Sequence, residues 1–347
     1  MGGVIRFFAF CGFVLGVTIC LGAAFVGAAT AAPEKPEISV QVYPGSMLNV
    51  PLQAALDLGI FKKYGLDVTL AAVPSGPLAQ QALVTGDLDI AFGTSDPGMA
   101  AKSKGADTQV FLGLYNANIW ALVARNAVSV PDQSKSYPAV MNNLKNLRVG
   151  VTGRGAASEF IVRSMFEDAG VNPDDASYIA VGGPATAYPA LSTNQVDVVL
   201  AFEPVMTLMQ TQGTGKILLD FRRGEGPASM RKMDGGFITF NATRKFITQN
   251  PNTVKAFQDS LMEAVKWIQD PKNRAGTSAI IKKYVAIGNV PNVETVIDKL
   301  IDDNVRYFGW TVDPQSIVAY SDFLLKYKLI TKAVDPADYL AAVTPRP

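Results

Sequence analysis

The stretch ISVQVYPGSMLNVPLQAALDLGIFKKYGLDVTLAAV, residues 38–73, determines the architecture expected for this chain. The apolar runs at its two ends predict two strands. Between them a helix is predicted from about Asn49, because Pro51 suits the first turn of a helix and Gly59 suits its end. Strand, helix and strand in this order predict a parallel sheet with helices on its faces.

The same alternation continues along the chain and then starts again. Further strands are predicted at residues 89–94, 147–152, 178–181 and 196–202, with helices at 77–85 and 158–169. The last third is predicted to be helical, over residues 252–269, 277–285, 293–308 and 314–329. Its regularly spaced apolar residues are expected in the core: Leu261, Val265, Ile268, Leu300, Val305 and Phe308.

An internal similarity indicates that the two series are related. Residues 82–90 (ALVTGDLDI) align without a gap on residues 190–198 (ALSTNQVDV), and both stretches run from a predicted helix into a predicted strand. The chain has 347 residues, which is more than one hydrophobic core usually serves. We therefore expect two related α/β lobes.

The N-terminus predicts export. Arg6 is the only charge before Glu34, residues 7–26 are apolar, and Ala31 ends a small-residue pattern suited to signal peptidase. We expect residues 1–31 to be a cleaved signal peptide and the mature protein to be periplasmic. The alternatives are an uncleaved membrane anchor and a lipid on Cys20, although a bulky Ile precedes that cysteine.

Composition excludes several kinds of chemistry. The chain has no His, and both cysteines, Cys11 and Cys20, lie in the leader. A Ser-His-Asp triad, a thiolate nucleophile, a structural disulfide and a His or Cys metal site are therefore not expected in the mature protein. Losing Arg6 changes 31 basic and 30 acidic residues to 30 and 30, and no basic run follows. We expect no nucleic-acid partner and no cofactor.

The residues GIFKKYGLDV at 59–68, with LVTGDLDIA at 83–91 and LKNLRVGV at 144–151, resemble the substrate-binding proteins of ABC importers in the nitrate, sulfonate and taurine group. The resemblance implies an α/β, two-lobed type II periplasmic binding fold. Each lobe has a mixed, mostly parallel sheet flanked by helices, and the C-terminal helices pack on the first lobe. The resemblance places the first lobe at residues 37–122 and 241–347, and the second at 123–240.

The same resemblance implies a function. A monomer would capture a small sulfonate, carboxylate or pyrimidine-like solute between its lobes and deliver it to the permease and ATPase of an importer. Two alternatives stay open: a ligand-sensing subunit for a membrane receptor, and a carboxylate-only hydrolase using Asp96 and Glu203. Neighbouring genes for a permease would separate the first alternative from transport.

Ligands of open α/β sheets bind beyond the carboxyl ends of the strands, so the loops that follow the strands supply the candidate contacts. Arg154 is placed to fork onto a carboxylate or sulfonate, whereas Glu203 and Asp96 favour N–H donors on the ligand. The hydroxyl residues suit helix caps equally well. The full set of candidate ligand contacts is Ser46, Met47, Ser75, Thr94, Ser95, Asp96, Trp120, Arg154, Gly155, Ser158, Thr186 and Glu203.

Overall fold

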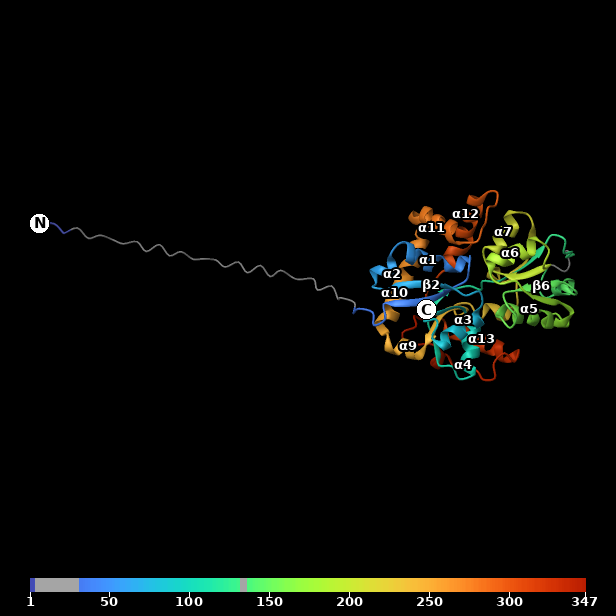
Figure 1. The fold of residues 1–347 in the computed structure, drawn as a ribbon, viewed down its shortest axis with the longest axis horizontal. Coiled ribbons are helices and arrows are strands. Elements are labelled where there is room, and N and C mark those ends of the chain that lie inside the picture. Colours follow the sequence, from blue (N-terminus) through green and yellow to red (C-terminus); the bar gives the residue numbers. More distant parts are fainter. Residues whose placement is uncertain (4–30, 132–135) are drawn as a thin grey trace. The chain divides into compact units, whose positions relative to one another are not determined.

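The structure is a computed structural model that describes residues 1–3, 31–131 and 136–347. Residues 32–347 form one compact unit (Figure 1). Residues 4–30 lie outside the described residues, and they include most of the predicted signal peptide, the alternative anchor and the alternative lipid site at Cys20. Among the helices of the described residues, none is both long and apolar enough to cross a membrane.

Five strands lie in the order β2-β1-β3-β10-β4, as a two-stranded sheet (β2-β1) and a three-stranded sheet (β3-β10-β4) that one bridge connects, and we call them together the first sheet. Their bounds are β1 (Glu37–Val42), β2 (Asp67–Ala72), β3 (Ala91–Thr94), β4 (Thr108–Tyr115) and β10 (Ile238–Thr243). β1 and β2 pair in parallel, and a parallel bridge between Val40 and Ile90 joins β1 to the start of β3. β10 lies antiparallel between β3 and β4.

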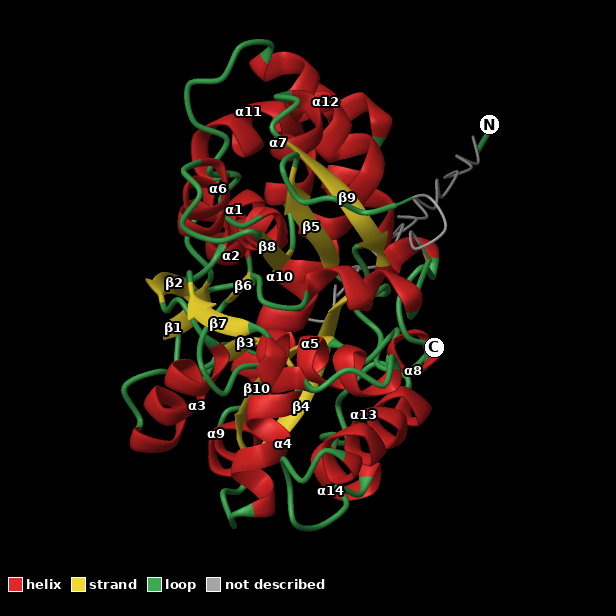
Figure 2. Ribbon diagram, turned by 90° about the vertical axis from the view of Figure 1, so that its right-hand side faces the viewer, coloured by secondary structure: helices red, strands yellow, loops and turns green. Residues whose placement is uncertain are grey.

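The second sheet repeats this arrangement, in the order β7-β6-β8-β5-β9 (Figure 2). Its strands are β5 (Ala121–Arg125), β6 (Arg148–Val151), β7 (Ser177–Ala180), β8 (Val198–Ala201) and β9 (Gly215–Asp220). β6 pairs in parallel with β7 and β8, whereas β5 is antiparallel to β8 and β9. The chain therefore crosses between the sheets twice, after β4 and after β9. The lobe boundaries given above stay a prediction.

Helices cover both sheets, and the sequence signals explain where they begin and end. The connecting helices are α1 (Val50–Asp57), α2 (Ile60–Lys63), α3 (Gly76–Thr85), α4 (Asp96–Ser103), α5 (Ala157–Asp168), α6 (Pro184–Ser192), α7 (Val205–Thr211) and α8 (Ala228–Arg231). Pro51 lies in the first turn of α1, and Gly59 follows that helix with a φ of 68°. This left-handed conformation is easily adopted by glycine, so the helix ends as predicted.

The C-terminal part is helical, as predicted. It consists of α9 (Arg244–Gln249), α10 (Pro251–Gln269), α11 (Arg274–Tyr284), α12 (Val293–Asn304), α13 (Pro314–Lys326) and α14 (Pro336–Tyr339). α10 and α11 pack on α1, so blue and orange segments lie side by side in Figure 1, and α13 packs on α4. α12 also packs against α7 of the second sheet. The six apolar positions predicted for the core are all buried.

The internal repeat has a structural counterpart. Residues 82–90 run from the end of α3 toward β3, and residues 190–198 run from the end of α6 to the start of β8. The aligned acids play the same role: Asp89 accepts from the backbone N–H of Ser39 in β1, and Asp197 accepts from that of Arg148 in β6, both at 2.9 Å. Each carboxylate thus ties the start of one strand, β3 or β8, to its parallel neighbour, β1 or β6.

Candidate ligand-binding site

Loops from the two sheets meet face to face. A Cβ added to Gly153, after β6, would lie 3.8 Å from the Cβ of Ser75, after β2. The backbone N–H of Met47, after β1, donates to the carbonyl oxygen of Glu203, after β8, at 3.3 Å. Because these loops follow parallel strands, the carboxyl ends of both sheets converge on one region, where ligands of such sheets bind.

A small cavity lies at this convergence, and we call it the inner cavity. Its walls include the aromatic residues Tyr43, Trp120 and Phe202 and the hydroxyl residues Thr94 and Thr152, and none of its lining residues is charged. The volume of the inner cavity that the centre of a water molecule can occupy is about 20 Å³. Roughly one buried water needs that much space. An organic ligand therefore enters only if the walls move apart.

The aromatic walls pack edge to face. The ring centroids of Trp120 and Phe202 are 5.2 Å apart with an interplanar angle of 88°, and those of Tyr43 and Phe202 are 5.9 Å apart at 79°. Burial raises the pKa of the Tyr43 hydroxyl, which stays neutral at physiological pH. Trp120 is 2% exposed, and among the described residues nothing accepts its Nε1–H. An unpaired buried donor costs about 1–3 kcal/mol, so an acceptor on a ligand would be favoured.

Two helices begin at the wall of the inner cavity. Gly76 starts α3 and Ala157 starts α5, and both line the cavity. The first backbone N–H groups of a helix have no partner within the helix, and its N-terminus attracts negative charge. Neither helix has a side-chain cap hydrogen bond. These backbone donors therefore suit a carboxylate, a sulfonate or another acceptor.

Several predicted hydroxyl contacts are engaged locally. Ser46 accepts from the N–H of Leu48 at 3.1 Å, and Ser95 donates to the carbonyl oxygen of Gly236 at 2.7 Å. Ser158 accepts from the N–H of Thr152 at 2.9 Å, and exposed Thr186 donates to Gly183 O at 3.1 Å. Of the predicted hydroxyl residues, the inner cavity contains only Thr94.

Arg154 lies on the outer side of the second lobe's loop. Its Nη2 is 3.1 Å from Oε1 of Glu159, its Nη1 donates to the carbonyl oxygen of Tyr178 at 3.0 Å, and its side chain is 57% exposed. The N–H of Gly155 also donates to Glu159, at 2.9 Å. The positive charge of Arg154 is therefore paired within its own lobe, and this residue does not line the inner cavity.

Glu203 is also paired. Its carboxylate accepts from the N–H and hydroxyl of Thr207, both at 3.0 Å, and from Nη1 of Arg222 at 3.3 Å. Burial raises the pKa of Glu203, and the guanidinium of Arg222 opposes that shift. Glu203 lines a separate small cavity with Met47, whereas Asp96 lines the groove described next. The pair of acids considered for a hydrolase does not share a cavity.

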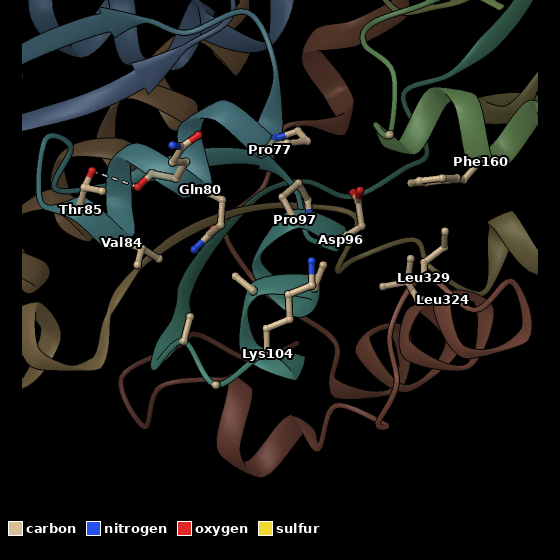
Figure 3. A pocket seen from close by; sticks show the side chains of 16 residues that line it. Pro77, Gln80, Val84, Thr85, Asp96, Pro97, Lys104, Phe160, Leu324 and Leu329 are labelled. Carbon is tan, nitrogen blue, oxygen red and sulfur yellow. Dashed lines mark hydrogen bonds between the residues drawn. The ribbon is translucent and has the colours of Figure 1, made fainter.

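An outer groove of about 720 Å³ adjoins the inner cavity, and both contain Pro77 and Pro97 in their walls (Figure 3). α3, α4 and α13 form most of it, while Gly155 and Phe160 come from the second lobe. Asp96 also lines this groove and is 6% exposed. The predicted contacts are therefore divided between two compartments and several locally bonded positions.

Three residues at this interface were missed from the sequence. Thr152 directly follows β6 as Thr94 ends β3, so the strand-end rule would have found it. Arg222 follows β9, another strand end. Asn304 ends α12, and nothing in its helix pattern marks it. Within the described ranges, no cluster of three or more acids could hold a metal ion.

Two sheets of one topology with an aromatic cavity between their strand ends define a two-lobed, ligand-binding protein of the periplasmic binding fold. The chain belongs to the NMT1-like family, whose model matches residues 31–282. This confirms the resemblance predicted from the GIFKKYGLDV stretch. Two of its relatives are binding proteins, and this confirms the prediction that the chain is a solute-binding protein and not an enzyme.

The chain is 24% identical to the binding protein YtlA of Bacillus subtilis, covering 76% of this chain and 77% of the relative. A binding protein of Brucella abortus is 23% identical, and the match covers 83% of this chain and 85% of the relative. Among solved structures, the alkanesulfonate-binding protein SsuA of Xanthomonas axonopodis, bound to MOPS, superposes with a TM-score of 0.70 at 17% identity over 90% and 99% of the two chains. The periplasmic nitrate-binding protein NrtA of Synechocystis has a TM-score of 0.67 at 18% identity over 88% and 85%.

Proposed function

We propose that this protein works outside the cytoplasm, captures a small organic solute between its lobes as a monomer, and delivers it to the permease and ATPase of an ABC importer. The descriptions of similar structures as periplasmic sulphonate- and nitrate-binding proteins support this proposal. A nitrate import ATP-binding protein of Synechococcus elongatus is also related, at 22% identity. The expected signal peptide fits the same compartment.

For the solute, we propose a planar or aromatic ring that carries a carboxylate or sulfonate. The observation that carries this proposal is the inner cavity: aromatic walls, the unpaired Nε1–H of Trp120 and two uncapped helix starts. A ring would pack against the aromatic walls, and its acidic group would accept from the backbone N–H groups. With no charged side chain in the wall, the helix termini and Trp120 supply the recognition.

Binding would proceed by closure. The inner cavity is too small for a ring, so the solute would enter while the lobes are apart and gain contacts from both when they close. Those extra contacts would stabilise the closed arrangement by the difference in affinity between the two states. A permease would then recognise the closed surface.

The test is a ligand panel of aromatic acids, sulfonates, nitrate, bicarbonate, pyrimidines and amino acids, read by thermal unfolding. A ligand at 100 times its dissociation constant should stabilise the fold by about 2.7 kcal/mol and raise the midpoint by several degrees. Trp120→Phe should weaken an aromatic acid about tenfold. Trp310→Phe is the matched control, because Trp310 does not line the inner cavity. Stabilisation only by ligands without an acidic group would contradict the proposed solute class.

A further inference from the structure

Asp96 differs from the other buried acids of this protein. Within the described part of the chain, the remaining buried acids all pair with arginine: Glu159, Asp197, Glu203 and Asp220. Asp96 pairs with no basic side chain there, although it is 6% exposed. Its Oδ1 accepts from the hydroxyl of Tyr320 at 2.8 Å. A buried carboxylate without a cation is costly, so its retention in a cavity wall calls for a partner.

The outer groove presents Asp96 to a ligand-sized space. Its volume of about 720 Å³ lies within the usual range of small-molecule sites, roughly 300–1,000 Å³. Figure 3 shows the Phe160 side chain directed across the groove toward Asp96, with Leu324 and Leu329 beside it. One carboxylate among apolar and aromatic walls is the complement of an ammonium group on an apolar body.

The charged and titratable groups near Asp96 do not neutralise its carboxylate. Lys104 is the groove's other charged side chain, but it is exposed and forms no ion pair with Asp96 in the described structure. Tyr320 and Tyr339 pack nearby, and burial raises the pKa of both hydroxyls, so they stay neutral. Burial also raises the pKa of Asp96, and a bound cation would lower it again.

We propose that the outer groove is a second compartment of the solute site, in which Asp96 is the counter-ion for an ammonium group of the solute. The inference rests on the proposed function, because it assigns a second contact to the same solute. The two compartments share Pro77 and Pro97 in their walls, so they lie next to each other. A solute with its acidic group in the inner cavity and its ammonium group in the groove bridges both lobes.

Three matched probes test this inference by calorimetry with the purified protein: para-toluate, para-(aminomethyl)benzoate and para-methylbenzylammonium. We expect the aminomethyl compound to bind about tenfold or more tightly than para-toluate, the range of a charged hydrogen bond. Asp96→Asn should remove this advantage and leave para-toluate within about twofold. Lys104→Gln, in the same groove, should retain the advantage.

A second variant keeps the test decisive if Asp96→Asn does not fold. Phe160→Ala changes a partly exposed wall residue, and it should reduce the gain from the ammonium group while sparing para-toluate. Thermal unfolding of each variant without ligand reports whether it folds.

The outcomes separate this inference from the proposed function. Equal affinities for para-toluate and the aminomethyl compound, or an advantage that survives Asp96→Asn, overturn the role of Asp96 while the proposed solute class stands. Binding of para-methylbenzylammonium that depends on Asp96, with no binding of either carboxylate, supports the groove and overturns the acidic solute. Failure of all three probes to bind overturns both.

Discussion

Arg222, two residues after the end of β9 of the second sheet, donates from Nη1 to Oδ1 of Asn304, the last residue of α12, at 3.0 Å. The same Oδ1 accepts from the hydroxyl of Tyr115, at the end of β4, at 3.2 Å. Arg222 is also held by Asp220, with Nη2 and Oδ2 at 2.9 Å. A buried polar network therefore connects the second sheet to α12 and to the first sheet, beside the crossing segments.

Asn304→Ala should loosen this connection. The hydroxyl of Tyr115 and one N–H of Arg222 would lose a buried acceptor, so we expect a loss of about 1–3 kcal/mol in the free energy of unfolding. Chemical denaturation measures this loss, and small-angle X-ray scattering should show a larger radius of gyration without ligand. Asp303→Ala, one residue earlier and paired with Lys299 alone among the described residues, is the control and should cost about 0.5 kcal/mol or less. Equal effects of the two variants would contradict the role of Asn304.

Arg222→Ala should be far more damaging. It would leave Glu203, which is 5% exposed, without its cation, and Asp220, which is 3% exposed, with only the exposed Arg223 at 3.6 Å. Removing one partner of a buried ion pair costs about 3–5 kcal/mol. Urea denaturation should show this loss, and Arg222→Lys should restore only part of it, because Lys has no planar fork. By contrast, Arg223→Ala, at an exposed side chain, should be nearly neutral. A mild effect of Arg222→Ala would show that the network carries little of the stability.

Asp197 should confer stability that depends on pH. Hydrogen bonds from Arg148, followed by those from Arg125, hold the pKa of this carboxyl well below its usual range. A lowered folded-state pKa gives stability that is present above the unfolded pKa, near 4, and is lost as the pH falls toward the folded value. Asp197→Asn should therefore lower the free energy of unfolding by about 1.5–3 kcal/mol at pH 7, and by progressively less below about pH 4. A deficit that does not change with pH would show that shape, not charge, matters.

Asp234 should have the opposite effect to Asp197 and lower the free energy of unfolding as the pH rises. Burial raises the pKa of its carboxyl to about 6. A raised folded-state pKa in an acid means that stability is greatest below the unfolded pKa and falls as the pH rises through the folded one. Asp234→Asn should therefore be more stable than the original protein at pH 7 and lose that advantage near pH 4. Its partial exposure limits the gain, and unfolding curves at several pH values measure it. No gain at pH 7 would contradict the raised pKa.

Gly93→Ala should disturb the inner cavity through Tyr43. Gly93 has a φ of 139°, and a Cβ there would collide with the hydroxyl of Tyr43. We expect a loss of about 1–3 kcal/mol in stability and weaker binding of aromatic acids. Gly105→Ala is the control, because Gly105 also has a positive φ, 96°, but its Cβ would meet nothing within 4 Å. If both variants bind equally well, Tyr43 is not a wall of the solute site.

The order of strands and helices was predictable because it depends on local patterns. Apolar runs, Pro51 and Gly59 act within a few residues of their own position, and they placed α1 and its neighbouring strands almost as observed. The aligned stretches at 82–90 and 190–198 predicted the repeat, and in the structure their acids Asp89 and Asp197 each make the same contact in their own sheet. The predicted helix at 293–308 is an α-helix up to Asn304 and continues as a 3-10 helix to Tyr307, and the side chain of Asn304 binds Arg222 and Tyr115.

The pairing of charges was decided only in three dimensions. From the sequence, Arg154 and Glu203 appeared free to contact a ligand. In the structure, Arg154 forms an ion pair with Glu159, and Glu203 binds Arg222 and Thr207. A strand-end rule finds which loops approach the site, whereas a hydrogen bond depends on a few tenths of an ångström between side chains. The sequence by itself therefore determined two lobes and the loops between them. The tertiary structure decided that Trp120 lines a neutral cavity and that Asp96 alone lacks a basic partner among the buried acids described.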